Sequence, residues 1–221
     1  MRSEDAGMLR IAVLVGSPRK NGACARFAAE LEDALRGAGA VAELLFLCDY
    51  EVLGCVGCGA CERTGACVLD AREGTGGRPG FACMLKRLQA VDALALVAPV
   101  YFSGPPSQLK AVLDRMQPLW CQRYLLGQRP VRPLECRRPL DLFAVGAGGD
   151  PFGHDALVSC ARSSLRMTDF ELHAMHDLVG FGQAPRPGCA YGPDFDAALL
   201  SNLSTWASGL VRAARAAHDL R

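Results

Sequence analysis

Short apolar runs alternate with longer amphipathic segments along most of this chain, and the alternation limits the possible folds more than any other feature. The apolar runs cover residues 10–15, 41–47, 92–98, 140–146 and about 169–175. Segments with helical spacing cover 23–37, 81–90, a stretch from Pro105 or Pro106 onward, 154–165 and about 194–217. Continuous apolar strands are typical of a parallel sheet that helices cover on both faces. The pattern therefore predicts an α/β fold with a doubly wound, five-stranded parallel sheet.

Five such strands suit a sheet of the flavodoxin type, in which ligands bind beyond the carboxyl ends of the strands. The loops after the first, third and fourth strands are therefore the predicted places for chemistry. A Cys- and Gly-rich loop over residues 48–80 follows the second strand and has little periodicity. We expect a single domain over residues 1–221 that includes this loop.

Composition excludes several classes of protein. The chain has 221 residues, of which 50% are hydrophobic and 21% charged, as in globular domains. A net charge of +1 leaves no electrostatic footprint for nucleic acid. We find no signal peptide and no apolar run of membrane-spanning length, so we expect a cytoplasmic protein without a membrane partner. The 11 cysteines are then expected to be reduced.

The first apolar run leads directly into the loop Gly16-Ser17-Pro18-Arg19-Lys20-Asn21-Gly22, and a helix follows. Backbone amides, the Ser17 hydroxyl and two cations converge at a helix N-terminus, where a phosphate group could bind. The loop matches neither the Walker A pattern nor the dinucleotide G-x-G-x-x-G pattern. A plain strand-to-helix turn with two solvated basic residues is the alternative interpretation.

Two further loops follow the third and fourth strands. Pro99-Val100-Tyr101-Phe102-Ser103-Gly104 offers aromatic rings and backbone amides, although Tyr101 and Phe102 could simply cap the core. Gly146-Ala147-Gly148-Gly149 would let the backbone approach a flat ligand closely. Beside the Gly16–Gly22 loop, both favour a site for a phosphorylated planar ligand.

Four of the cysteines, Cys55, Cys58, Cys61 and Cys67, spell C-x2-C-x2-C-x5-C among several glycines. Four thiolates are the ligand set of an iron–sulfur cluster or of a structural zinc ion. Short consecutive intervals favour a [4Fe-4S] cluster, whereas zinc sites more often separate two C-x-x-C pairs by a longer stretch. Zinc, and free or redox-paired thiols, remain as alternatives.

The Gly16–Gly22 loop, Ala98–Gly104 and the segment Leu109-Lys110-Ala111-Val112-Leu113-Asp114-Arg115 resemble those of the flavodoxin-like NAD(P)H-dependent FMN reductases. The resemblance implies FMN, with its phosphate at the first loop and its ring at the other two. One departure is Ala23-Cys24, where relatives often carry a Thr whose hydroxyl helps to hold the phosphate. The implied cofactor-binding residues are Ser17, Arg19, Lys20, Asn21, Gly22, Cys24, Pro99, Val100, Tyr101, Phe102, Ser103, Gly104, Gly146, Gly148 and Gly149.

Within these reductases, the cysteine motif is similar to that of the iron–sulfur flavoproteins at all four cysteines. That resemblance implies one [4Fe-4S] cluster and one FMN per chain, in a homodimer or homotetramer with a cluster close to the flavin of a neighbouring subunit. The sequence departs from the family after Cys67, where Val68-Leu69-Asp70-Ala71-Arg72 replaces the common Asp-Asp-Met.

The leading hypothesis is an oxidoreductase that passes electrons between a reductant, such as NAD(P)H or ferredoxin, and a small-molecule or protein acceptor. One alternative is an NAD(P)H-dependent FMN or quinone reductase without a cluster. Another is a non-enzymatic redox carrier or sensor, and a biosynthetic dehydrogenase that uses both cofactors also stays open. We identify no general acid or base, which fits chemistry carried by cofactors.

The other residues with titratable or charged side chains are predicted to have structural roles. His173 and His176 are predicted to point to opposite faces of a strand, which disfavours a metal site. Asp114 and Arg115 are predicted to pack and cap a helix. The Arg-rich segment 123–138 could bind an anionic substrate or the phosphate of NAD(P)H, but the favoured prediction is a solvated excursion.

Overall fold

The computed structural model describes residues 7–130, 132–185 and 187–220. Its centre is a sheet of five strands, all parallel, in the order β2-β1-β3-β4-β5. The strands are β1 (Arg10–Val15), β2 (Val41–Phe46), β3 (Ala93–Pro99), β4 (Arg138–Gly146) and β5 (Phe170–Val179). This is the strand order of the flavodoxin-like fold, so the predicted fold class is confirmed.

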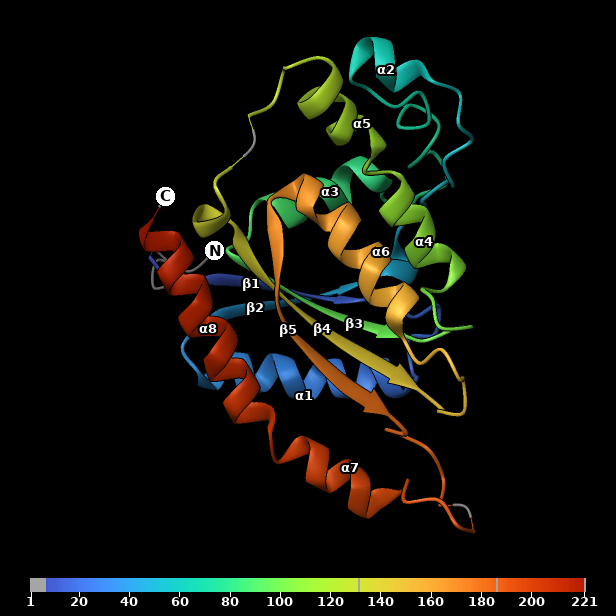
Figure 1. Ribbon diagram of the computed structural model, residues 1–221, viewed down its shortest axis with the longest axis vertical. Coiled ribbons are helices and arrows are strands. Elements are labelled where there is room, and N and C mark those ends of the chain that lie inside the picture. The colour runs from blue at the N-terminus through green and yellow to red at the C-terminus, as the bar shows by residue number, and fades with distance from the viewer. Residues whose placement is uncertain (1–6, 131, 186, 221) are drawn as a thin grey trace.

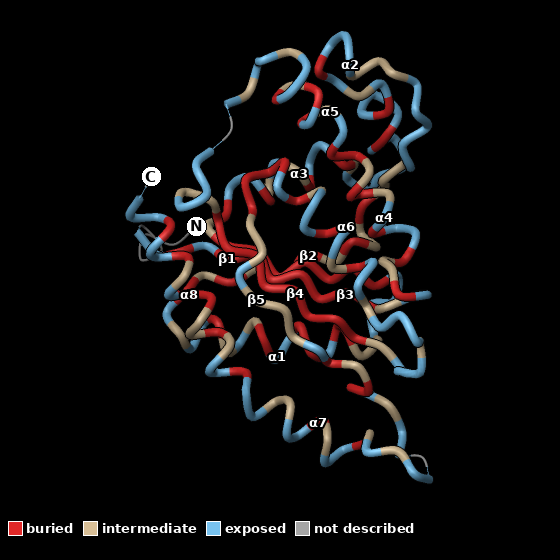
Figure 2. Tube along the Cα trace, viewed as in Figure 1, coloured by how far each residue is buried: buried red, intermediate tan, exposed pale blue. Residues whose placement is uncertain are grey.

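Helices cover both faces of the sheet (Figure 1). On one face lie α1 (Ala23–Gly37) and α8 (Leu203–Asp219), and on the other lie α3 (Phe81–Gln89), α4 (Ser107–Asp114) and α6 (Asp155–Leu165). Strand β3 is buried along its whole length, because its alternate side chains enter two different apolar cores (Figure 2). The near-continuous apolar runs in the sequence reflect this two-sided burial.

The C-terminal helix is two helices rather than one. Helix α7 (Pro193–Leu200) ends before α8 begins. At the break, the Ser201 hydroxyl and the Asn202 amide both donate to the Ala198 carbonyl, at 2.7 and 3.1 Å. Ser and Asn side chains compete for backbone hydrogen bonds in this way and so interrupt helices. The expected helix over 194–217 is corrected accordingly.

The segment before β4 is more ordered than the sequence suggests. It forms α5 (Gln117–Trp120), a π-helical turn η3 (Cys121–Leu125) and a short turn η4 (Leu134–Cys136), and β4 begins at Arg138. Arg123 and Arg138 are both buried, so the predicted solvated excursion is wrong for these two side chains. Each guanidinium is hydrogen-bonded to backbone carbonyls, which compensates for its loss of water.

The two histidines on β5 lie on the same side of the strand, which corrects the expectation of opposite faces. The register of β5 against β4 shifts between Leu140 and Asp141, which is the mark of a β-bulge. His173 Nδ1 and His176 Nε2 therefore both reach the buried Asp141 carboxylate, at 2.8 and 3.2 Å. Within the described part of the chain, no helix is long and apolar enough to cross a membrane.

Candidate functional site

A small cavity of about 180 Å³, here called the Ser17 cavity, lies where β1 meets α1. The N-cap residue of α1, Gly22, contributes no capping side chain, and the first turn of the helix carries no acidic residue. The amides there are therefore open to an anion. The lining residues of the cavity are Ser17, Arg19, Ala23, Cys24, Pro99, Val100, Tyr101, Val145, Gly146, Ala147 and Gln183.

The Gly16–Gly22 loop divides into residues that line this cavity and residues that do not. Ser17 is buried, and its hydroxyl accepts a hydrogen bond from the Arg19 amide at 3.1 Å. Lys20 instead pairs with Asp49, whose hydrogen bond raises the pKa of Lys20. Lys20, Asn21 and Gly22 are not among the lining residues of the Ser17 cavity.

Cys24 lies in the first turn of α1 and lines the Ser17 cavity. Its side chain is 3% exposed, and burial raises the pKa of its thiol to about 12. The thiol therefore stays protonated at neutral pH, and Cys24 faces the cavity as a small neutral group.

A larger cavity of about 600 Å³, here called the Gly148 cavity, adjoins the first and shares Val100, Gly146 and Ala147 with it. The other lining residues are Phe102, Gly148, Gly149, Asp150, Gly153, His154, Asp177, Val179, Tyr191 and Phe195. Together the two cavities offer a helix N-terminus beside a broad, glycine-walled space. The residues present therefore fit a phosphorylated planar cofactor such as FMN.

A tight turn projects one aromatic ring at the mouth of the Gly148 cavity. Tyr101 and Gly104 exchange backbone hydrogen bonds of 2.9 and 3.0 Å, and Phe102 and Ser103 adopt φ values of 50° and 64°. Such values are unfavourable for residues other than glycine. The Ser103 hydroxyl donates to the Phe152 carbonyl at 3.1 Å and so ties the turn to the next loop. Phe102 is 99% exposed, and Gly104 lines neither cavity.

The chain after β5 supplies a wall that sequence reasoning missed. Gly180 has φ +103°, and a Cβ placed there would lie 2.1 Å from the Tyr191 ring, so only glycine lets that ring pack where it does. Tyr191 and Phe195 make an edge-to-face contact with ring centroids 5.1 Å apart. The predicted topology could have indicated this segment, because the chain after β5 begins at the end of the sheet where ligands bind.

A separate cavity of about 270 Å³, here called the cysteine cavity, is lined by Cys55, Cys58, Cys61 and Cys67. The short helix α2 (Ala60–Thr64) lies within this segment, and Gly57 and Gly59 have φ values of 64° and 70°. Glycine adopts such angles without strain, which lets the chain turn sharply between the thiols. The structure thus brings all four predicted ligands to one cavity.

A buried ion pair anchors the cysteine segment to α4. The guanidinium of Arg115 is 1% exposed, pairs with Glu73 and Asp70, and donates to the Leu53 carbonyl at 3.0 Å. Glu73 also accepts from the backbone amides of Leu53 and Phe81, at 2.7 and 2.8 Å. Arg115 was predicted only to pack and cap its helix, whereas it holds both ends of the segment.

A fifth cysteine, Cys121 of η3, lines the same cavity and was missed. Its thiol is buried and hydrogen-bonded to Cys61, and these surroundings raise its pKa to about 11. Sequence analysis did not identify Cys121 because it lies far along the chain from the cysteine motif.

Four thiolates can hold either a single zinc ion or an iron–sulfur cluster. Around one zinc ion, thiolates converge to about 3.8 Å from one another, given Zn–S bonds of about 2.3 Å. Across the described residues, no three Cys, His, Asp or Glu side chains are grouped to hold one ion. The four thiols around the shared cavity are the donor set of an iron–sulfur cluster and also of a structural zinc ion.

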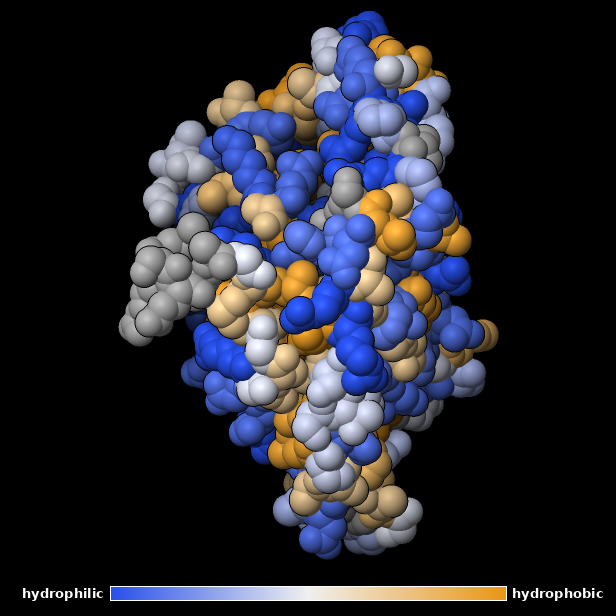
Figure 3. All heavy atoms as spheres, turned by 90° about the vertical axis from the view of Figure 1, so that its left-hand side faces the viewer, coloured by the Kyte–Doolittle hydropathy of each residue, from blue (hydrophilic) through white to orange (hydrophobic). Residues whose placement is uncertain are grey.

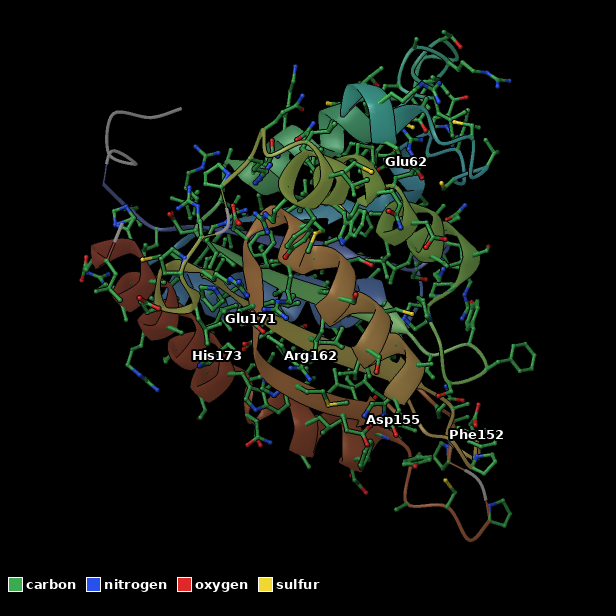
Figure 4. All side chains as sticks on the ribbon, turned by 45° about the horizontal axis from the view of Figure 1, so that its top comes forward. Glu62, Phe152, Asp155, Arg162, Glu171 and His173 are labelled. Carbon is green, nitrogen blue, oxygen red and sulfur yellow. The ribbon has the colours of Figure 1, made fainter. Side chains whose placement is uncertain are left out.

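The two regions lie at different parts of the molecule. In Figure 4, Glu62 of α2 and Phe152, beside the Gly148 cavity, are at well-separated places. Helix α4 links them, since it starts after the Tyr101–Gly104 turn and its C-cap residue is Arg115.

Sequence comparison relates the chain to flavoproteins. A family model described as NADPH-dependent FMN reductase matches residues 9–186. An iron-sulfur flavoprotein of Methanocaldococcus jannaschii is 32% identical over 113 residues, which are 50% of this chain and 53% of that protein. An iron-sulfur flavoprotein of Methanosarcina thermophila is 30% identical over 107 residues, or 48% and 52% of the two chains. The chain spans about half the length of these curated relatives.

Structural comparison gives the same fold. RosB, solved with bound 8-demethyl-8-formylriboflavin-5'-phosphate, has a TM-score of 0.64 and 12% identity, covering 96% of this chain and 81% of its own. The azoreductase AzrA has a TM-score of 0.59 and 12% identity, covering 90% and 99%. At these identities the likeness shows the fold alone.

Proposed function

The chain belongs to the NADPH-dependent FMN reductase family, and on this premise we propose that it is an FMN-dependent oxidoreductase of the iron–sulfur flavoprotein kind. In this proposal, electrons pass between a reductant, such as NAD(P)H or ferredoxin, and an acceptor by way of FMN and a [4Fe-4S] cluster. The observation that carries the proposal is the pairing of two adjoining cavities at the strand ends with a separate cavity lined by four cysteines.

The residues around the first two cavities have distinct proposed roles. Ser17, Arg19 and the first amides of α1 bind the phosphate of FMN, and Cys24 contributes a neutral surface in place of a hydroxyl. Val100, Tyr101 and the glycines at 146–149 contact the ring through backbone and apolar atoms. Tyr191 and Phe195 cover the far side of the Gly148 cavity and exclude water from it.

The four motif cysteines are the proposed cluster ligands, with Arg115 and Glu73 holding the segment that carries them. Bound FMN would supply two-electron hydride chemistry, and the cluster would supply one-electron transfer. His154 and Tyr191 line the Gly148 cavity, where they provide proton donors beside a bound acceptor.

Exposed apolar side chains support a homo-oligomer. Phe102 and Phe152 are 99% and 75% exposed beside the Gly148 cavity, and Val56 is 70% exposed beside the cysteine cavity. Two neighbouring exposed phenylalanines, such as Phe102 and Phe152, are typical of surfaces that become covered in an assembly. In the proposed oligomer, the cysteine cavity of one copy lies close to the flavin of a neighbouring copy.

Strictly anaerobic purification tests the function. The visible spectrum should show flavin together with iron–sulfur absorption, and assays should find FMN, iron and acid-labile sulfide. NADH or NADPH should bleach the flavin if either is the donor, whereas bleaching only by reduced ferredoxin would identify a protein donor. Flavin with zinc in place of iron and sulfide would refute the cluster and leave a cluster-free reductase.

A further inference from the structure

Arg115 brings to the cysteine cavity a buried polar atom that lacks a hydrogen-bond partner among the described residues. The side chain lines this cavity and is 1% exposed. Its Nη atoms are paired, but its Nε is buried and makes no hydrogen bond to any residue that the structure describes. Since a buried donor without an acceptor costs free energy, such an atom calls for an acceptor in a group that binds beside it.

The rest of the guanidinium group is held in one orientation. Nη1 pairs with Glu73 and donates to the Leu53 carbonyl at 3.0 Å, and Nη2 pairs with Asp70. The group also lies over the Phe81 ring, with Cζ 4.8 Å from the ring centroid. Turning Nε toward one of these acceptors would break a buried ion pair. The donor is therefore preorganised, because the contacts that fix the guanidinium group use its other nitrogens.

The cavity offers this hydrogen bond rather than an excess of positive charge. Two carboxylates, those of Glu73 and Asp70, already balance the charge of Arg115. The other charged residues that line the cavity are the acidic Glu62 and Asp114, which disfavour a free anion there. Figure 3 shows hydrophilic side chains over the upper part of the molecule, where α2 lies in Figure 1, whereas Arg115 is shielded from solvent. The acceptor for Nε should therefore be a polarisable atom held in the cavity.

Sulfur atoms are the acceptors that the proposed function places in this cavity. We propose that the Nε–H group of Arg115 donates a hydrogen bond to a sulfur atom of the cluster that the four motif cysteines bind. The inference rests on the proposed function, because it takes the cluster as the occupant of the cavity. Hydrogen bonds to the sulfurs of a cluster favour its reduced, more negative state. Arg115 therefore raises the reduction potential of the cluster.

Arg115→Lys removes the proposed donor and keeps the charge. Lysine carries a methylene group at the position of Nε, and its ammonium group lies near the position of Cζ, where it can still pair with Glu73. At a fixed solution potential, the ratio of oxidised to reduced cluster should rise by roughly tenfold, a fall of about 59 mV for a one-electron couple. A redox titration of the anaerobically purified protein, followed by EPR of the reduced cluster, measures this shift.

Arg123→Lys is the matched control. Arg123 is also buried, pairs with Asp169 and has an Nε without a partner among the described residues, but it does not line the cysteine cavity. Its substitution should leave the potential of the cluster unchanged. An unchanged potential in Arg115→Lys, or an equal shift in the two variants, would overturn the proposal.

Pulsed EPR of the wild type decides the matter even if Arg115→Lys assembles no cluster. In protein labelled with heavy nitrogen at arginine, the reduced cluster should show a weak coupling to that nitrogen, since Arg115 is the arginine among the described lining residues. A cluster without this coupling would refute the inference alone. Absence of iron and acid-labile sulfide from the wild type would instead refute the proposed function, and the inference with it.

Discussion

The strand-end cavities and the cysteine cavity are built in different ways. The walls of the first are loops that leave the buried strands β1, β3 and β4, so the core of the sheet positions them. The cysteine cavity lies in a segment whose own side chains are largely exposed, and a buried arginine of a neighbouring helix anchors it (Figure 2). The core of the sheet thus positions the strand-end cavities, whereas a buried ion pair holds the cysteine segment in place. We therefore expect that a substitution can disrupt one of these two sites and leave the other intact.

The largest expected effect comes from removing that charge. Glu73→Ala leaves the Arg115 guanidinium buried without its closest partner, which typically costs about 3–5 kcal/mol. Urea unfolding should show this loss, and the variant should lose iron while it retains FMN.

Lys110→Ala is the control, since Lys110 forms an exposed pair with Asp114 within the same helix and does not line the cysteine cavity. Such pairs contribute only about 0.3–0.5 kcal/mol. Equal destabilisation by the two variants would show that the Glu73–Arg115 pair has no special role.

A substitution at the Gly148 cavity should have the converse effect, namely weaker FMN binding with an unchanged iron content. Gly180→Ala places a methyl group against the Tyr191 ring and imposes a strained φ, at about 1–3 kcal/mol for the strain. FMN affinity, measured by fluorescence quenching, should fall while the iron content stays unchanged.

Gly188→Ala is the control, because Gly188 has φ +75° but open space around its Cβ position. It imposes the same kind of backbone strain as Gly180→Ala without placing a methyl group against a neighbouring side chain. It should cost stability without weakening FMN binding. If both alanine variants bind FMN equally, Tyr191 does not form part of the site.

The Asp141 cluster allows the core to be perturbed without touching either site. Burial opposes the charge of Asp141, yet hydrogen bonds from His173 and His176 lower its pKa. The hydrogen bond to Asp141 raises the pKa of His173 above its ordinary 6.5. A raised histidine pKa stabilises the fold at low pH and loses that effect as pH rises through the folded value.

The melting temperature of the wild type should therefore exceed that of His173→Gln at pH 6, and the gap should narrow by pH 8. On the acid side, the Asp141 contribution should be lost as pH falls from the ordinary aspartate value of 3.8 through the lower pKa of Asp141 in the folded protein. A gap that widens between pH 6 and pH 8 would contradict the assigned direction for His173.

The smallest expected effect concerns the rates at which cysteine thiols are alkylated. With its pKa raised to about 12, the buried Cys24 thiol should resist iodoacetamide at pH 8 in the folded protein, whereas the exposed Cys83 should react. Cys58 should become reactive only when the cluster is removed. Peptide mass spectrometry checks all three, and rapid labelling of Cys24 before unfolding would show that the Ser17 cavity is open to solvent.

Sequence predicted the sheet and the location of its ligand-binding loops well, because two-sided burial leaves a direct mark on apolar patterning. It placed Ser17, Arg19 and Cys24 at one cavity and the four motif cysteines at another. It could not find Tyr191, Cys121 or the Glu73–Arg115 pair, because each depends on contact between segments distant in the chain. The β5 bulge was also hidden, since a register shift leaves no mark in residue type.

The separate construction of the two sites is tested most directly by the FMN, iron and sulfide contents of anaerobically purified Cys58→Ser. Cys58 lines the cysteine cavity and neither of the two strand-end cavities. The account predicts that FMN stays at the wild-type level while iron and acid-labile sulfide are lost, and that the control Cys121→Ala retains all three. Retention of iron and sulfide in Cys58→Ser, or loss of FMN together with them, would contradict it.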